Sequence, residues 1–511
     1  MLTVKQRKTL EILRRFEADA ISKTDEEIFK ETSELDQKYG HDPTYAHNID
    51  GVLTNIGKTK KSLCLLYHAR NRLLRILLTT KEEFPAYNLG NALLAIGEIK
   101  CSNSFEELIR SRELREAREY FSLIPPGRSF PQANTNLANI LEKYGRNYEA
   151  IQVYDKVLKK QPTFGMALGN KGKAILYYYN LMSAKDPDLL FQAAELLKTA
   201  IGEKNTIEQG GQKAVDSFRR ELNILGSYLS HYQIKRPSQK RPLKSISRYQ
   251  RFCMVKNLFL NSCFNCFRCA RGFSDSLKPY FIDKPKINSD ESSYRDSGYT
   301  RKTYYSIKTL NQIYEDFASA RYIYFHASTA GFRHYDSITK YSSALDYCNN
   351  TLQYGLTKTT YIRLFNILDK IAHLVYTNYE IGPEKVYFYN MKSAQIVDLV
   401  SKKKSWSLLA LHSLAWDFLE NEIYHHLSQI RNYITHEFID IGPFVDNGDD
   451  DDQYYIHHHL SENSLHAYLE DLFLLVKSAL MYTMNALYQD YLEERKQGPP
   501  LLMPIYPQKQ F

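Results

Sequence analysis

The chain has 511 residues, of which 43% are hydrophobic and 24% are charged. This balance is ordinary for a folded globular protein and excludes an intrinsically disordered chain, while the length allows about two to four domains. No apolar run reaches the roughly 18 residues that a membrane-spanning helix requires, and the net charge of +9 favours a polyanionic partner.

The first segment, residues 1–19, mixes basic side chains with Leu10, Ile12 and Leu13 at helical spacing, which predicts an amphipathic helix. It has neither the apolar core segment nor the small-residue cleavage site of a secretory signal. We therefore expect the protein to be cytoplasmic.

A helical repeat is the clearest pattern in the first half of the chain. Between Pro131 and Phe164, small, apolar and turn residues occupy the positions of one helix-turn-helix unit of about 34 residues. Gly145 is expected to form the turn, and Pro162 to end the second helix. Ala138 and Ala150 are small enough to let the two helices cross closely. The residues of the pattern are Leu137, Ala138, Leu141, Gly145, Tyr148, Ala150, Ile151, Tyr154 and Pro162.

Similar units precede and follow this one. An earlier unit has its first helix at residues 89–97 and, after an insertion, its second helix at residues 117–121. A later unit uses residues 167–174 and 193–197, and a weaker first unit surrounds Gly57. The pattern resembles tetratricopeptide (TPR) repeats, which stack into a helical solenoid. The resemblance implies a TPR-like helical repeat domain over residues 1–230, with a protein or peptide ligand in its groove.

Basic residues concentrate in the next segment, residues 231–303, which we interpret as a linker between two helical domains. Between His231 and Lys256 there are eight lysines and arginines and no acidic residue, interleaved with aromatic residues. Such a segment can pair with phosphates and stack on bases of RNA, or it can be a solvated linker stiffened by prolines. The residues that we assign to RNA binding are Lys235, Arg236, Lys240, Arg241, Lys244 and Arg248.

The linker also contains four of the seven cysteines. Cys263, Cys266 and Cys269, with Cys253 upstream, could hold zinc or an iron–sulfur cluster. The usual zinc site pairs two such knuckles across a longer loop, whereas this run is interrupted by phenylalanines that indicate buried apolar positions. We therefore expect neither a metal nor a cofactor.

Residues 304–511 are expected to form an all-α helical bundle without the repeat. Apolar spacing predicts helices around Ile307, Ile338 and Tyr361, a long helix from Ser405 to Ile441, and a last helix over residues 465–496. Five aspartates among residues 446–452 predict a self-repelling surface loop between the last two helices.

Arg431, Asn432 and His436 lie near the end of the long predicted helix. Its buried stripe is expected to consist of Leu427, Ile430, Ile434 and Phe438. At about 100° per residue, Asn432 and His436 fall nearly opposite that stripe, and Arg431 lies at its border with a side chain long enough to reach them. Histidine can transfer protons near neutral pH and arginine can neutralise phosphate charge, so this face could cut RNA without a metal.

A second arginine and histidine have the same spacing. In Arg321–His326 an aromatic residue follows the arginine and no small polar residue supports the histidine. We interpret the aromatic side chains of this segment as packing residues, and we do not assign a site to it.

The bundle resembles HEPN domains, whose signature is an arginine, a polar residue and then a histidine after four to six intervening residues. The succession of repeats and bundle resembles the TPR-linked HEPN proteins of prokaryotes, which are regarded as RNases in toxin, stress or antiphage systems. The resemblance implies that Arg431, Asn432 and His436 are catalytic, that cleavage gives 2′,3′-cyclic phosphate and 5′-hydroxyl ends, and that a homodimer forms through the HEPN domain. One departure is Phe438, where some HEPN toxins have a tyrosine that a partner enzyme modifies.

The sequence is also consistent with two other functions. Phosphate-binding glycine loops, zinc-protease helices and serine elbows are absent from the sequence, so those enzyme classes lack support. One alternative is a non-catalytic TPR–HEPN scaffold that dimerises or binds RNA, and another is a TPR sensor that regulates a separate effector. The shared face of Asn432 and His436, with Arg431 beside it, favours the enzyme.

Overall fold

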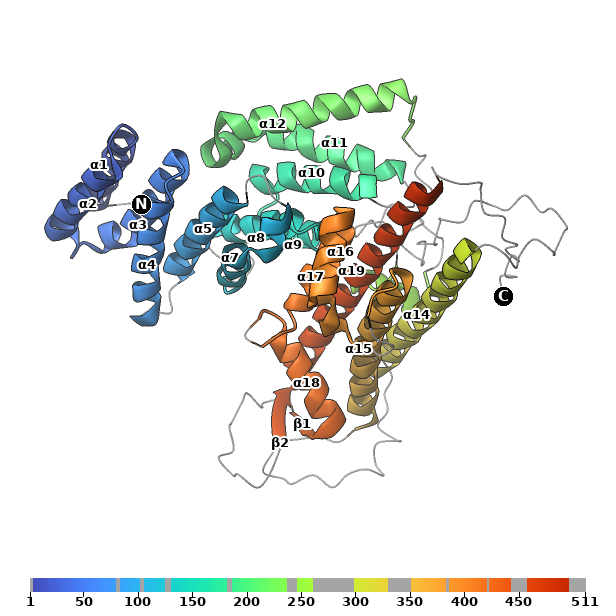
Figure 1. The fold of residues 1–511 in the computed structure, drawn as a ribbon. Coiled ribbons are helices and arrows are strands. Elements are labelled where there is room, and N and C mark those ends of the chain that lie inside the picture. The colour runs from blue at the N-terminus through green and yellow to red at the C-terminus, as the bar shows by residue number, and fades with distance from the viewer. Residues whose placement is uncertain are drawn as a thin grey trace. The chain divides into compact units, whose positions relative to one another are not determined.

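The prediction of an all-α protein is confirmed in the part of the chain that the structure describes (Figure 1). There the chain forms nineteen α-helices, one 3-10 helix and a single pair of short strands. None of these helices combines the length and the apolar character that crossing a membrane requires. The computed structural model describes residues 3–79, 83–101, 105–124, 130–181, 186–236, 246–260, 298–329, 351–382, 386–420, 422–442 and 457–495.

The chain divides into two compact units. Unit 1 comprises Met1–Tyr144, Ala150–Lys171 and Lys198–Arg219, and unit 2 comprises Gly145–Glu149, Gly172–Leu197 and Arg220–Phe511. Unit 2 therefore combines short pieces of the predicted repeat region with the C-terminal helices.

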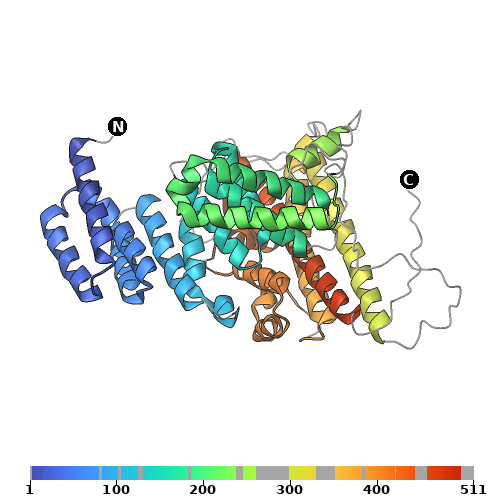
Figure 2. The same ribbon diagram turned by 90° about the horizontal axis from the view of Figure 1, so that it is seen from above.

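Unit 1 begins with helices most of which pack on a near neighbour in the chain, and they follow one another as a row of blue helices in Figure 2. Helices α9 to α12 follow and contribute to both units. The helices are α1 (Val4–Ala20), α2 (Asp25–Tyr39), α3 (Pro43–Lys60), α4 (Leu63–Thr79), α5 (Glu83–Lys100), α6 (Phe105–Arg110), α7 (Arg112–Ser122), α8 (Pro131–Lys143), α9 (Asn147–Lys160), α10 (Gly165–Leu181), α11 (Pro187–Gly202) and α12 (Lys204–His231).

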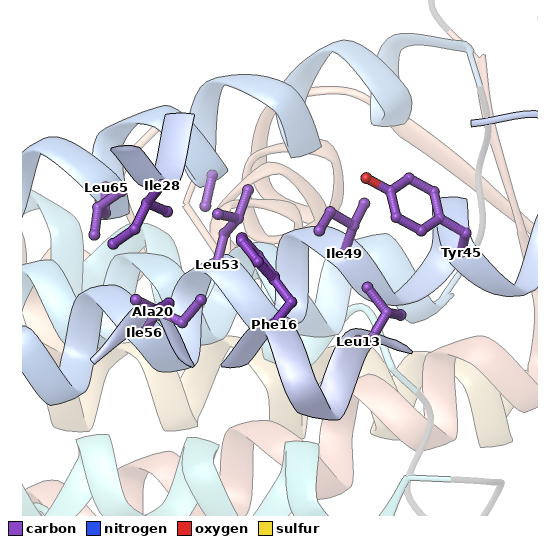
Figure 3. Close-up of a cluster of buried hydrophobic side chains, with 10 residues drawn as sticks. Leu13, Phe16, Ala20, Ile28, Tyr45, Ile49, Leu53, Ile56 and Leu65 are labelled. Carbon is purple, nitrogen blue, oxygen red and sulfur yellow. The ribbon is translucent and has the colours of Figure 1, made fainter. Parts of the chain in front are cut away.

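The predicted amphipathic helix at the start of the chain is α1. Thr3 caps it, because its hydroxyl accepts a hydrogen bond from the backbone N–H of Gln6, while the Gln6 side chain accepts one from the N–H of Thr3. The buried face of α1, including Leu13 and Phe16, joins apolar side chains of α2, α3 and α4 in one core (Figure 3). Burial of this apolar face, rather than helix propensity alone, stabilises α1.

Glycines stand where helices of unit 1 approach most closely. A Cβ atom on Gly90 of α5 would lie 2.6 Å from the ring of Phe121 on α7, and one on Gly97 would lie 2.6 Å from Leu114. The predicted turn between α8 and α9 is formed by Gly145, whose φ of +73° favours glycine. The insertion in the earlier unit contains α6.

In unit 2, α14 packs along α15, and both α15 and α17 pack on the long last helix α19 (Figure 1). Apolar residues such as Leu364, Leu411 and Leu472 are fully buried in these helices. The helix expected around Ile338 lies outside the described residues. The elements are α13 (Arg248–Val255), α14 (Gly298–Thr329), α15 (Leu352–Asn378), η5 (Phe388–Lys392), α16 (Ala394–Lys403), α17 (Trp406–Trp416), α18 (His425–His436), β1 (Phe438–Gly442), β2 (His457–Ser461) and α19 (Glu462–Arg495).

The prediction of one long helix from Ser405 to Ile441 is wrong. The chain turns after α17, where the backbone N–H of Tyr424 donates to the carbonyl oxygen of Asp417 at 2.7 Å, and α18 begins only at His425. The chain then leaves helical geometry after His436 and forms β1. Consequently Phe438, expected in the buried stripe, is 67% exposed.

The turn between α17 and α18 is fixed by a charge cluster buried inside unit 2. The guanidinium of Arg146, which is 1% exposed, donates to Asp417 at 2.5 Å and to both carboxylate oxygens of Glu149. The hydroxyl of Tyr482 also donates to Glu149, at 3.0 Å. Burial lowers the pKa of Arg146, but the charges of Asp417 and Glu149 outweigh it and raise the pKa well above the ordinary value.

Strands β1 and β2 pair in parallel, from Phe438 opposite His457 to Gly442 opposite Ser461. The amine of Lys358 on α15 donates to the carbonyl oxygen of Ile439 at 2.9 Å and ties β1 to the bundle. Burial lowers the pKa of Lys358, and the charge of Asp440 partly offsets that effect. The predicted acidic loop, residues 446–452, lies outside the described residues.

Candidate functional site

Helix α18 holds the predicted catalytic residues on a well-anchored backbone. Leu427 is fully buried and Ile430 is 6% exposed, so one side of the helix is fixed in the core. The hydroxyl of Tyr361 on α15 donates to the carbonyl oxygen of Leu427 at 3.0 Å. The opposite side of α18 is thereby presented to solvent with a defined orientation.

Arg431, Asn432 and His436 occupy that open side and its border. Asn432 and His436 are exposed, and Arg431 is half-buried. The guanidinium of Arg431 already turns toward Asn432, because its Nη1 donates to Asn432 Oδ1 at 3.1 Å. His436 follows Asn432 by one helical turn and is the last residue of α18. A phosphate on this face could contact the arginine and the histidine together.

Asp369 of α15 supplies a negative charge close to Arg431. Burial raises the pKa of Asp369, while a hydrogen bond from the backbone N–H of Phe388 and the charge of Arg431 lower it. The N–H of Phe388 lies 2.8 Å from Asp369 Oδ1. The charge of Arg431 therefore acts on the Asp369 carboxyl, while the guanidinium itself donates to the amide oxygen of Asn432.

A second histidine, His458 of β2, adjoins the end of α18. Its Nε2 lies 2.5 Å from Oε2 of Glu437, the residue after His436. Its ring stacks on Tyr433 of α18, with centroids 3.4 Å apart and planes 15° apart. His458 was not predicted as a site residue, although the run of three histidines at residues 457–459 is visible in the sequence.

The described part of the predicted RNA-binding segment makes several contacts within unit 2. Lys235 is exposed, whereas Arg236 forms an ion pair with Glu195 at 2.8 Å. Arg248 donates to the backbone oxygen of Thr329 at 3.3 Å. Lys240, Arg241 and Lys244 lie outside the described residues. The structure thus places Arg236 and Arg248 in protein contacts and does not place either with Arg431.

Only one of the four possible metal ligands lies in the part of the chain that the structure describes. Cys253 is fully buried on α13, and Cys263, Cys266 and Cys269 lie outside the described residues. Within the described ranges, no group of three or more histidine, cysteine, aspartate or glutamate side chains has the arrangement of a metal site.

Comparison with known families gives one match. The family described as LA2681-like HEPN matches residues 298–490, a range that runs from the start of α14 into α19 and includes Arg431, Asn432 and His436. A HEPN domain is therefore present in unit 2. Comparisons with curated proteins and with solved structures give no match.

Proposed function

We propose that the protein is a metal-independent endoribonuclease of the HEPN type. The observation that carries this proposal is the common location of Arg431, Asn432 and His436 on the open side of α18 and its border, inside a HEPN domain. Arginine and amide groups can donate hydrogen bonds to an RNA phosphodiester, and an imidazole can transfer the protons of its cleavage.

In the proposed reaction, the ribose 2′-oxygen attacks the adjacent phosphorus and the bond to the 5′-oxygen breaks. His436 accepts the 2′-hydroxyl proton, as a neutral imidazole can near neutral pH. Arg431 stabilises the charge that accumulates on the phosphorane with paired N–H donors. Asn432, which already accepts a hydrogen bond from Arg431, keeps the guanidinium on the His436 side of the helix. The products carry 2′,3′-cyclic phosphate and 5′-hydroxyl ends.

The remaining parts of the proposal concern regulation and assembly. The helical hairpins that include Gly90, Gly97 and Gly145 support a TPR-like solenoid, which would bind a protein or peptide that controls the nuclease. A homodimer through the HEPN domain would bring two Arg431–His436 faces together. A toxin or antiphage role follows from the resemblance to TPR-linked HEPN proteins.

The test is cleavage of RNA by the full-length protein in the presence of EDTA, followed by mass spectrometry of the product ends. We expect cyclic phosphate ends, which disappear with His436→Ala. The matching experiment with a substrate whose 2′-hydroxyls are methylated should give no product, because the nucleophile is blocked. RNA that stays intact with the wild type, or cleavage that persists in His436→Ala, would argue instead for a non-catalytic scaffold.

A further inference from the structure

We propose that His458 is a second proton-transfer residue of this site and protonates the departing 5′-oxygen. The inference rests on the proposed endoribonuclease function and adds to it a general acid within the same chain. A transesterification needs one group to remove the 2′-proton and another to supply a proton to the leaving oxygen, and His436 can perform only one of these tasks at a time.

Two contacts orient the imidazole of His458. Glu437 Oε2 lies 2.5 Å from Nε2, so the carboxylate fixes the ring and engages that nitrogen. Tyr433 covers one face of the ring in a nearly parallel stack. A carboxylate that orients a histidine through one ring nitrogen leaves the other nitrogen for proton transfer, as in the serine protease triad. The ring nitrogen Nδ1 is therefore the one proposed to meet the substrate.

The geometry of α18 places His436 beside Tyr433, the residue on which His458 stacks. Around the helix axis, His436 lies about 40° from Asn432 on one side and about 60° from Tyr433 on the other. Residues three apart on a helix have Cβ atoms about 5–6 Å apart, so His436 begins next to the ring on which His458 stacks. Arg431 with Asn432 and Tyr433 with His458 thus flank His436 on opposite sides.

The site is open enough for a substrate. The side chains of His458 and Glu437 are 32% and 31% exposed. Such partial burial restrains both side chains and still lets a phosphate approach the His458 ring from solvent. Phe438, 67% exposed at the start of β1, lies next to Glu437 and adds apolar surface at the same end of α18.

Other charged groups surround the strand pair from the elements that pack against it. In β1, Ile439 is the residue opposite His458, and its carbonyl oxygen accepts a hydrogen bond from Lys358 of α15. Asp440 of β1 lies opposite His459. From α19, Glu462 pairs with His466 at 3.8 Å. Glu437 is the carboxylate that contacts the His458 ring directly.

The step balances without a co-reactant. As the bond between the 2′-oxygen and phosphorus forms, His436 takes the 2′-proton. As the bond between phosphorus and the 5′-oxygen breaks, His458 gives its Nδ1 proton to that oxygen. His436 then holds one proton more than before and His458 holds one fewer, and proton exchange with water restores both.

The test compares two RNA substrates that differ at one atom. In the second substrate, sulfur replaces the bridging 5′-oxygen at a single cleavage position, and a thiolate leaves without needing a proton. We expect His458→Gln to slow cleavage of ordinary RNA by about 100-fold or more, within the range of general acid catalysis, and to cut the sulfur substrate nearly as fast as the wild type. His436→Ala should remain slow on both substrates, because the 2′-proton must still be removed.

Two further variants separate chemistry from folding. His459→Gln changes the next residue, whose side chain points to the other face of the strand, and should leave both rates unchanged. Glu437→Gln keeps a hydrogen-bond acceptor near His458 and should slow only the ordinary substrate, by a smaller factor. A His458→Gln protein that cuts ordinary RNA at the wild-type rate, or is equally slow on both substrates, overturns the role of His458. Wild-type protein that cuts neither substrate overturns the endoribonuclease itself, and the role of His458 with it.

Discussion

Unit 2 contains two arginine–histidine segments of identical spacing in opposite surroundings. Arg321 of α14 is 4% exposed, donates to the Tyr249 hydroxyl at 2.9 Å and to the backbone oxygen of Leu258 at 3.2 Å, and lies over the ring of Phe259. On α18, in contrast, Arg431 lies at the border of the open face that carries His436. The N–H groups of Arg321 hold α13 and the residues that follow it against α14. Arg431 keeps donors that a substrate can use.

This contrast shows that spacing alone does not identify a site. His326 packs between aromatic rings, with centroids 4.4 Å from Tyr322 and 5.2 Å from Phe325. His436 has the open surface at the end of its helix instead. The aromatic residue after Arg321 and the small polar residue after Arg431 are the sequence features that separate the two surroundings.

The largest effect on stability is expected at a third arginine, Arg146. Unlike Arg321, it is buried against charged partners. Arg146→Met would leave the buried carboxylates of Asp417 and Glu149 without their cation. We expect a loss of about 3–5 kcal/mol in the free energy of unfolding of unit 2. Both tryptophans, Trp406 and Trp416, lie in α17, so their fluorescence during urea denaturation reports on this unit.

Arg236→Met is the matched control within unit 2, because Arg236 forms an ion pair with Glu195 in which the side chains are 47% and 60% exposed. Exposed pairs contribute little, so unfolding should be almost unchanged. Equal effects of the two substitutions would mean that the Arg146 cluster does not hold the turn between α17 and α18.

Next in size is the effect of Arg431 on activity. Arg431→Ala should reduce RNA cleavage by about 100- to 1000-fold, because it removes donors that stabilise the transition state. The free energy of unfolding should hardly change, since the side chain lies at the helix border. Arg431→Lys, which keeps the charge but not the paired N–H groups, should restore only part of the rate. Activity that survives in Arg431→Ala would break the distinction between the two arginines.

Arg321→Met should show the reverse pattern. Loss of the hydrogen bonds to Tyr249 and Leu258 is expected to cost about 1–3 kcal/mol in the free energy of unfolding. Cleavage per folded molecule should stay within about two-fold of the wild type, because the guanidinium is buried and donates to Tyr249 and Leu258. The measurement pairs a denaturation curve with the rate at saturating RNA. A loss of rate without a loss of stability would assign a catalytic role to Arg321.

The smallest effect concerns Asp369 and is dependent on pH. Burial raises the pKa of Asp369 in the folded protein. The free energy of unfolding therefore decreases as the pH rises through that pKa and the carboxyl becomes charged. Asp369→Asn keeps an acceptor for the Phe388 N–H and removes the charge. The variant should match the wild type below pH about 4 and be more stable by about 1 kcal/mol or less at pH 7. A variant that is less stable at pH 7 would show that the Arg431–Asp369 attraction outweighs the cost of burial.

Local patterns in the sequence were sufficient for much of the fold. The all-α class, the turn at Gly145 and the last helix follow from apolar spacing and from a glycine in the left-handed region. The buried side of α18 was also visible, since Leu427 and Ile430 lie in the core. These features depend on residues close together in the chain.

The features that were missed depend on residues far apart. The break after Trp416 is stabilised by Arg146, which lies 271 residues before Asp417. The pairing of β1 with β2 places His458 against Glu437 across 21 residues of the chain. Apolar spacing continues through residues 405–441, so the periodicity gave no sign that the helix ends. The candidate site was consequently visible as Arg431, Asn432 and His436, but not with His458.

The most direct measurement is the rate of RNA cleavage in EDTA by His436→Ala beside His326→Ala, with the wild type as reference. We predict a loss of about 100-fold or more for His436→Ala, since general acid–base groups contribute at least that factor, and a change within about two-fold for His326→Ala. Equal rates in the two variants would contradict it, because the surroundings of the two histidines would then make no difference to function.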